Sequence, residues 1–380
     1  MSIIRFKQKD FSVPLLFREL ISPESSFAYV ELNRAKSFNR IIKYLRSGKF
    51  LIIMDSSLER ADILYKKINE RIDEIIPFDK MQNISSKSFS RNRKREFDKL
   101  KSNLLNRVLL VSRENIIISF LEEIRIPYLI SFCGENPNIS DLSKEYLLPF
   151  KFFIELKESL DRKILIKCSE FIISSGINVL LPKSQETSEL FKNAMTELKR
   201  NSGIRIIDMG CGSGILTLIA NSVFEDSEIH FADILPEALA STLNNLDKNI
   251  SGINNNNSLI CHDPCDLFEN MDELFDLIIF NPPWVNAEAE NRKEYALNDR
   301  GQKLLERFMI QAKNRLMPDG KIVIAYSDNG GEKSVIRFNQ IAEQNGFVTE
   351  KEYSAKVQSY QSGRKRMRIF VRILKPRDLN

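Results

Sequence analysis

A short segment that ends a buried strand carries the residue types best suited to chemistry. The apolar run LIIF (277–280) stops at NPPW (281–284). Two consecutive prolines remove two backbone donors and fix two φ angles, so no sheet ladder continues through them. The corner offers the side-chain oxygen of Asn281 and the carbonyl of Pro282 as acceptors, and Trp284, the only tryptophan, as an aromatic face. A rigid corner that carries an amide and an aromatic ring at the end of a buried strand is a candidate site.

A second candidate site is the glycine-rich segment DMGCGSG (208–214). Gly210, Gly212 and Gly214 allow a sharp turn and let a ligand lie against bare backbone at a helix N-terminus. The segment lacks the Lys-Ser/Thr of a P-loop and the spacing of the dinucleotide fingerprint. The next expected strand ends in Asp233, 23 residues after Gly210. An acid there can accept hydrogen bonds from both ribose hydroxyls of an adenosine.

The elements that must position these residues alternate along the chain from residue 203. Apolar runs predict strands, and the segments between them have helical character. Strands that alternate with helices indicate a mostly parallel sheet covered on both faces, and so an α/β fold. Two further extended stretches end the chain. The expected strands are 203–210, 227–234, 257–263, 275–281 and 320–327, and the expected helices are 215–223, 236–250, 301–317 and 334–346.

Residues 1–172 are expected to form an N-terminal mixed α/β domain that recognises the substrate, and residues 173–380 a domain that carries the chemistry. The polar, basic segment 81–102 is expected to be a mobile surface segment. Within the N-terminal domain, helices are expected at 38–50 and 59–76, and short buried strands at 50–55, 107–112 and 126–132.

The charges are unevenly divided between the two halves of the chain. Residues 1–170 hold 31 Lys and Arg against 23 Asp and Glu, whereas residues 171–380 hold 25 against 28. A polyanion would therefore bind mainly to residues 1–170.

Composition points to a cytoplasmic protein without a membrane partner. No apolar run approaches the ~18 residues of a membrane span, and charges interrupt the start too often for a signal peptide. The five cysteines are scattered and odd in number, unlike a disulfide framework. CHDPC (261–265) could offer two thiolates and an imidazole. Because no second cluster accompanies it, small residues at a strand end are expected there, and no metal site.

Three segments together carry a resemblance: IIDMGCGSGILTL, FADILPEAL and FDLIIFNPPW. They resemble the class I S-adenosylmethionine-dependent methyltransferases, and most closely the N-methyltransferases with an N/D-P-P-Y/F/W motif and a methyltransferase small domain. That group includes N6-adenine methyltransferases and the glutamine methyltransferases of release factors. VLLPKSQETSEL (179–190) is similar to the PRP-x-TE-like segment of the glutamine group. The resemblance covers roughly residues 175–375. It implies a Rossmann-like, mostly parallel seven-stranded sheet, and S-adenosyl-L-methionine as cofactor.

The resemblance also implies which residues hold the cofactor. The glycines would pack against its methionine part, Asp208 would orient their loop or the cofactor's amino group, and Asp233 would bind the ribose. At the adenine side two alternatives stay open: Asp263, which ends the third strand, and Asp266 with Leu267, which match the family register. The predicted cofactor contacts are Asp208, Gly210, Gly212, Gly214, Asp233, Asp263, Asp266, Leu267 and Asn281.

The same resemblance makes Asn281, Pro282 and Trp284 the predicted catalytic residues. An amide or exocyclic amino nitrogen is a poor nucleophile because its lone pair is delocalised. The oxygens of Asn281 and Pro282 would each accept one N–H, which positions the nitrogen and favours its developing positive charge. Trp284 departs from the tyrosine usual in release-factor enzymes, and tryptophan or phenylalanine is more frequent in nucleic-acid enzymes.

The expected reaction is methyl transfer to a planar nitrogen of a macromolecule, and several acceptors stay open. A Gln or Asn amide of a protein fits the overall resemblance, and adenine N6 of RNA or DNA fits Trp284 and the basic front half. The alternatives are a small-molecule amine or heterocycle, and a methyltransferase-fold protein that binds without catalysis. The loop 285–301 is expected to lie over the acceptor site. Arg366, Arg368 and Arg372 on a terminal hairpin would share one face suited to RNA phosphates.

Overall fold

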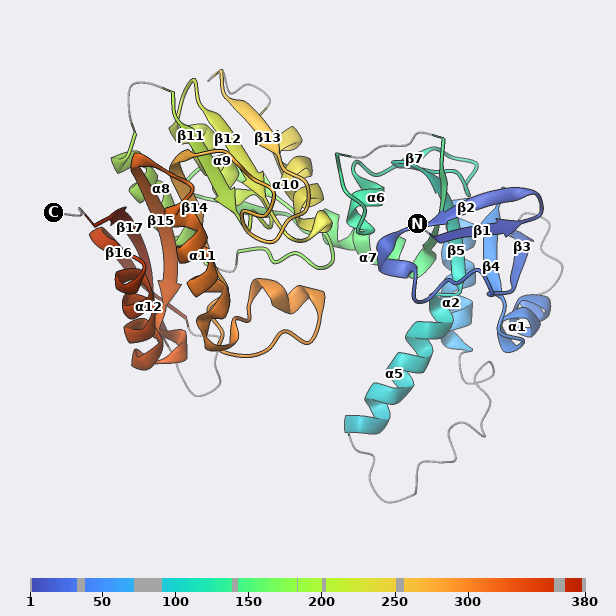
Figure 1. The fold of residues 1–380 in the computed structure, drawn as a ribbon. Coiled ribbons are helices and arrows are strands. Elements are labelled where there is room, and N and C mark those ends of the chain that lie inside the picture. Colours follow the sequence, from blue (N-terminus) through green and yellow to red (C-terminus); the bar gives the residue numbers. More distant parts are fainter. Residues whose placement is uncertain are drawn as a thin grey trace. The chain divides into compact units, whose positions relative to one another are not determined.

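The chain forms two compact units in a computed structural model (Figure 1). The first unit comprises Met1–Glu135 and Ile139–Glu158, and the second Asn136–Asn138 and Ser159–Asn380. None of the described helices is long and apolar enough to cross a membrane. The structure describes residues 2–32, 38–71, 91–138, 143–182, 184–199, 203–250, 256–358 and 366–377.

The first unit contains a mixed sheet with the order β1-β2-β8-β5-β4-β3, and β6 and β7 continue from β5. β3, β4 and β5 are parallel neighbours, whereas β8 is antiparallel to β5. The strands are β1 (Ser2–Phe6), β2 (Lys9–Val13), β3 (Phe27–Glu31), β4 (Phe50–Met54), β5 (Val108–Arg113), β6 (Ile116–Ile117), β7 (Ile124–Arg125) and β8 (Glu145–Pro149). The helices are α1 (Phe38–Arg46), α2 (Leu58–Glu70), α5 (Arg91–Leu105), α6 (Leu129–Phe132) and α7 (Phe150–Asp161), the last of which continues into the second unit.

Two predictions for this region are wrong. The strand expected at 126–132 is the short helix α6, which follows Tyr128 in a left-handed turn with φ 59°. A short apolar run does not distinguish a strand from a buried helical turn. The mobile segment expected at 81–102 is helical from Arg91 onward, and the buried Leu104 and Leu105 anchor the end of α5. Residues 81–90 lie outside the described residues.

The second unit is built on a seven-stranded sheet with the order β13-β12-β11-β14-β15-β17-β16. The first five are parallel neighbours, and β17 and β16 are antiparallel, so the predicted mostly parallel α/β sheet is confirmed. The strands are β11 (Arg205–Met209), β12 (Glu228–Ala232), β13 (Ser258–Cys261), β14 (Phe275–Phe280), β15 (Leu316–Ser327), β16 (Phe347–Gln358) and β17 (Arg366–Pro376). The helices are α8 (Gln185–Glu197), α9 (Ile215–Val223), α10 (Pro236–Asn249), α11 (Lys303–Lys313) and α12 (Glu332–Gln344).

A small hairpin precedes this sheet, formed by β9 (Ile164–Ile166) and β10 (Phe171–Ile173). Both strands belong to the second unit. The domain boundary predicted after residue 172 therefore falls inside β10. Short 3-10 helices also occur at η1 (Leu15–Phe17), η3 (Arg292–Ala296), η4 (Arg300–Gln302) and η5 (Asp328–Gly330).

The continuous apolar character of the central strands follows from helices on both faces of the sheet. Successive side chains point to opposite faces, and in β14 they alternate between two buried clusters. Leu277 and Ile279 join the cluster that includes residues of α8 and α9, whereas Ile278 and Phe280 join the cluster that includes residues of α11 and α12. A strand buried on both faces has no polar side and shows no period of two.

The largest boundary error in this unit lies between α11 and β15. The sequence predicted a helix over 301–317, but α11 ends at Lys313 and β15 already begins at Leu316. Phe275 of β14 pairs with Leu316 of β15, but Leu277 pairs with Lys321. The extra residues of β15 between Leu316 and Lys321 are therefore accommodated by an irregularity in the pairing. α11 ends with Asn314 as its C-cap, and the next residues already pair with β14.

Gly214 begins α9 with φ 77°, and a Cβ there would lie 2.8–3.0 Å from Thr242 of α10. We expect Gly214→Ala to lower the free energy of unfolding by about 2–4 kcal/mol, because it adds a steric clash to the backbone penalty. Gly301→Ala is the matched control, since φ is 71° and nothing lies within 4 Å. It should cost only about 1–2 kcal/mol. Urea unfolding followed by Trp284 fluorescence would measure both, and equal losses would contradict the packing role of Gly214.

Candidate functional site

The carboxyl ends of three parallel strands form one row. Met209 of β11 pairs with Ala232 of β12 on one side and with Phe280 of β14 on the other. The glycine loop, Asp233 and Asn281 follow directly at the same edge of the sheet. Neighbouring strands are about 4.8 Å apart. The backbones at Asp233 and Asn281, two strands apart, are therefore separated by about 10 Å, with the glycine loop between them.

Asp208 is a deeply buried acid of this edge, with 1% of its surface exposed. Its Oδ2 accepts a hydrogen bond of 2.7 Å from the hydroxyl of Thr217 on α9. Its Oδ1 is buried without a partner among the described residues. Burial raises the pKa of Asp208 to about 7, against the lowering effect of the Thr217 hydrogen bonds. Such an oxygen can accept a hydrogen bond from a cationic ligand group.

Asp233 is bonded to the glycine loop and to the start of α10. Its Oδ2 accepts from the backbone N–H of Gly212 at 3.1 Å, and its Oδ1 from that of Leu235 at 2.9 Å. Burial raises the pKa of Asp233 to about 6, and these backbone bonds oppose the rise. Each carboxylate oxygen has a second lone pair, so the group can still accept two hydroxyl donors.

The three loop glycines differ in their surroundings. A Cβ on Gly212 would meet no atom nearer than 3.9 Å, so its backbone faces open space that a ligand could use. A Cβ on Gly210 would touch only the ring of Phe280, at 3.4 Å. Gly214 instead lies against Thr242. The loop thus combines open backbone with one position reserved for the close approach of α9 and α10.

The Asn-Pro-Pro-Trp corner presents one exposed and two buried residues before the tryptophan. Asn281 is exposed, Pro282 and Pro283 are buried, and Trp284 is half-buried. The Trp284 ring packs against both core clusters. Its indole N–H is buried and finds no partner in the described part of the chain. The buried prolines therefore hold the corner, while the amide of Asn281 is accessible to an acceptor.

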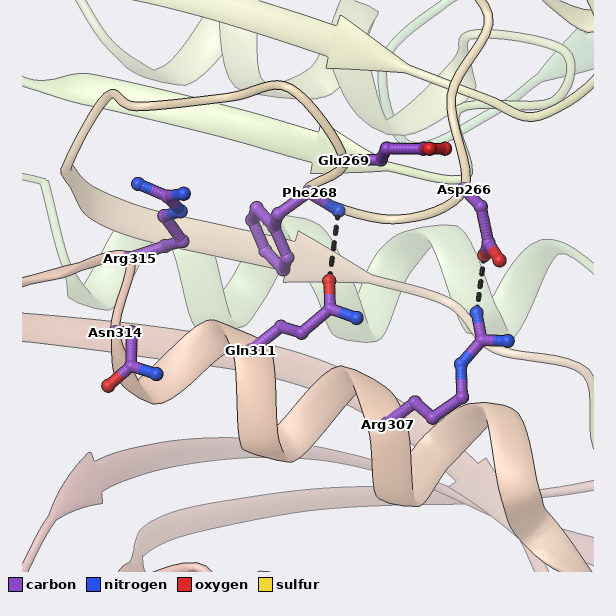
Figure 2. Close-up of a pocket in the computed structure, with 7 residues that line it drawn as sticks. All are labelled: Asp266, Phe268, Glu269, Arg307, Gln311, Asn314 and Arg315. Atoms are coloured by element: carbon purple, nitrogen blue, oxygen red, sulfur yellow. Dashed lines mark hydrogen bonds and ion pairs between the residues drawn. The ribbon is translucent and has the colours of Figure 1, made fainter.

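The two alternatives for the adenine side differ in what they contact. The Asp263 carboxylate accepts a hydrogen bond of 2.9 Å from Asn138, and bonds from Asn136 and Asn138 lower the pKa of Asp263. Asp266 points toward α11 and pairs with Arg307 (Figure 2). Leu267 is buried. A choice between Asp263 and Asp266 at the adenine stays a prediction.

Asp266 lines a pocket of about 450 Å³ between its loop and α11. Figure 2 shows the Phe268 N–H bonded to Gln311 across the same space. The lining contains none of the residues in the strand-end row. The pocket walls are Asp266, Phe268, Glu269, Arg307, Gln311, Asn314 and Arg315.

The two thiols and the imidazole of CHDPC (261–265) make hydrogen bonds with nearby groups. The thiol of Cys265 donates to the carbonyl of Leu267, and that of Cys261 to the carbonyl of His262. His262 lies 2.8 Å from the ring nitrogen of His230. Across the described residues, no group of three or more His, Cys, Asp or Glu could hold a metal ion.

The three arginines predicted to share a face lie on β17, but Arg372 is already paired. Its guanidinium bonds Glu352 at 2.8 Å and Asn339 at 2.5 Å, and only 11% of its side chain is exposed. Of the three arginines predicted to bind a polyanion, only Arg366 and Arg368 are therefore exposed.

Sequence reasoning missed several residues around the row. Ile234 directly follows Asp233 and is 49% exposed, which is unusual for an isoleucine at the end of a buried strand. Glu237 is 1% exposed and binds Arg292 and Asn178. Glu237 could have been flagged as an acid in the first turn of the helix in PEAL, but nothing in the sequence pairs it with Arg292. These contacts bring loops from three parts of the chain together.

A glycine loop after β11, an acid after β12 and an Asn-Pro-Pro corner after β14, on this sheet order, define the class I methyltransferase fold. The methyltransferase small domain matches residues 185–353. A protein assigned as an N5-glutamine methyltransferase in Methanocaldococcus jannaschii is 31% identical over 172 residues, which are 42% of this chain and 81% of that protein. The chain belongs to the methyltransferase small domain family, so the family predicted from the sequence is confirmed.

Other relatives match over a smaller part of their length. The release factor glutamine methyltransferase of Lactococcus lactis is 24% identical over 50% of this chain and 65% of that protein. The ribosomal RNA small subunit methyltransferase C of Actinobacillus pleuropneumoniae is 28% identical over 36% of each chain. This chain thus spans slightly less than two thirds of the first protein and about a third of the second.

The raised pKa of Asp208 predicts a pH-dependent stability. Its carboxyl has a pKa of about 7 in the folded protein against 3.8 ordinarily, so the folded state binds more protons between these values. Stability from this group is therefore lost as the pH rises through that window. Asp208→Asn should remove the loss. The free energy of unfolding of the Asp208→Asn variant should equal that of the unsubstituted protein near pH 4. At pH 8 it should be higher by up to about 4 kcal/mol. Urea unfolding across this range is the measurement, and a difference independent of pH would contradict the assignment.

Proposed function

We propose that this protein transfers a methyl group from S-adenosylmethionine to a planar nitrogen of a macromolecule. The observation that carries the proposal is the row formed by the glycine loop, Asp233 and Asn281 at one edge of the sheet. The row and the adjoining Asp208 combine open backbone, one buried and one half-buried acid for a nucleoside-bearing cation, and an exposed amide beside them. Family membership supports the same class of reaction.

The residues of the row fit this cofactor. The partnerless Oδ1 of Asp208 suits the cofactor's ammonium group, and the bare backbone at Gly212 suits the adjoining chain. Asp233 would accept the ribose hydroxyls, with Ile234 offering an apolar surface next to it. Asp263 or Asp266 with Leu267 would meet the adenine. When bound, S-adenosylmethionine supplies a methyl group on a positively charged sulfur, which a nitrogen can attack in line.

Asn281 and Pro282 would prepare the acceptor nitrogen. The Asn281 oxygen and the Pro282 carbonyl each accept one N–H, and the buried prolines fix the direction of these acceptors. Two fixed acceptors stabilise the positive charge that develops on the nitrogen, without reorganising during the reaction. Trp284, packed across both clusters, would limit where a planar acceptor can lie. The methylated nitrogen is acidic and releases its proton without a strong base.

The acceptor that we favour is the side-chain amide of a glutamine in a protein. Two of the relatives, from Methanocaldococcus jannaschii and Lactococcus lactis, carry names of glutamine methyltransferases. Adenine N6 in RNA is the second candidate. The matched relative named for ribosomal RNA, the basic front half and Trp284 favour it.

Two substitutions separate binding from catalysis. We expect Asn281→Ala to keep the affinity for S-adenosylmethionine but to lose most turnover, about 100-fold or more, because one fixed acceptor is removed. Asp233→Ala should instead lose cofactor affinity. Calorimetric binding and a methyl-transfer assay would measure the two effects. Full activity of both variants would show that the site is assigned to the wrong residues.

The acceptor class can be tested by adding the purified protein and S-adenosylmethionine with a tritiated methyl group to lysate from cells that lack the protein. Label released only by protease would support the protein amide. Label released by RNase would replace it with the RNA candidate and give the front half a nucleic-acid role. The Asn281→Ala variant is the control for label that does not depend on the site.

A further inference from the structure

A buried ion pair fastens the loop after the catalytic corner to the start of α10. Glu237 is 1% exposed, and both its oxygens accept from the guanidinium of Arg292, Oε1 from Nε at 2.7 Å and Oε2 from Nη2 at 2.9 Å. The amide of Asn178 adds a third bond to Oε1, at 3.0 Å. Glu237 raises the pKa of Arg292, and the nearby charge of Asp233 contributes in the same direction.

The topology of the sheet decides where this loop must run. Residues 285–301 begin at the end of β14, directly after Trp284, whereas Glu237 lies just beyond β12. β11 lies between β14 and β12 in the sheet. A loop that starts after β14 and is fastened beyond β12 therefore passes the carboxyl end of β11, where the glycine loop lies. Glu237 lies in the first turn of α10, and Leu235 directly before this helix bonds Asp233, so the pair places Arg292 at the Asp233 end of the row.

The Arg292–Glu237 pair differs from the other ion pair of the same loop. Arg300 pairs with Glu288, but these side chains are 65% and 70% exposed, whereas those of Arg292 and Glu237 are 33% and 1% exposed. An exposed pair contributes little. Breaking a buried pair leaves an uncompensated charge, which is strongly unfavourable. Loss of Arg292 would therefore leave the buried carboxylate of Glu237 without its charged partner.

We propose that Arg292 and Glu237 are positioning residues that hold the loop 285–301 across the cofactor site, so that cofactor exchange requires this pair to open. The inference rests on the proposed function, because it assumes that the row binds S-adenosylmethionine. The loop would both retain the cofactor and complete the wall beside Asn281. Its opening would limit how fast the spent cofactor leaves.

The test follows the exchange of S-adenosylhomocysteine in the full-length protein. Trp284 is the only tryptophan and directly precedes the loop, so its fluorescence in a stopped-flow experiment is the probe. We expect Arg292→Gln to speed dissociation at least tenfold, and Arg292→Lys, which loses the two-pronged contact, to show an intermediate effect. Arg300→Gln is the matched control and should stay within twofold of the unsubstituted protein. Glu237→Gln combined with Arg292→Gln should add nothing further.

Hydrogen exchange of the ligand-free proteins provides a second measurement. Amides of residues 285–298 should exchange faster in Arg292→Gln than in Arg300→Gln. A dissociation rate within twofold of the unsubstituted protein in a folded Arg292→Gln would overturn the inference and leave the proposed function intact. If the unsubstituted protein binds neither S-adenosylhomocysteine nor S-adenosylmethionine, the proposed function is overturned. The inference that the ion pair limits cofactor exchange is then overturned as well. The hydrogen-exchange result would then still decide whether the pair holds the loop.

Discussion

The parallel ladder that joins β12, β11 and β14 decides where the functional groups of the second unit lie. Because side chains alternate between faces, Asp208 lies on the face covered by α9, where Thr217 can bond it. A slip of one residue would move Asp208 to the opposite face, among the aromatic residues of the other cluster. The same ladder fixes the glycine loop between Asp233 and Asn281. The helices on both faces make this register the one that buries the apolar side chains.

Holding acids at this edge costs stability. Asp208 and Asp233 both have pKa values raised by burial, to about 7 and about 6. Backbone N–H groups of the glycine loop and α10 offset part of the cost at Asp233, but Asp208 has only Thr217 and keeps one oxygen without a partner. A purely structural position of this kind would favour an apolar residue. Perturbed, incompletely bonded acids are typical of functional sites, which is consistent with a cationic ligand at this edge.

The sequence predicted those parts of the structure that depend on local pattern. The strands of the parallel sheet are apolar runs with polar or glycine residues directly after them, so the row of Asp233 and Asn281 could be anticipated from strand order. The start of β15 was not anticipated, because the pairing of Leu316 with Phe275 depends on the neighbouring strand and not on the local pattern. The pair of Glu237 and Arg292 was equally hidden. Its members are 55 residues apart and meet only because the sheet places their loops at one edge.

The internal bonds of the loop 285–301 determine how it could open. Asn286 bonds the N–H of Gly301, and backbone bonds join Val285 to both Leu297 and Asp299, so the two ends of the loop are tied together. Glu294 bonds the neighbouring backbone and side chains within the loop. A segment closed on itself in this way loses little of its own structure when it moves. Opening would be a displacement of a preformed unit that breaks the contact of Arg292 with Glu237, while Asp299 ties the other end of the loop to the backbone of α11.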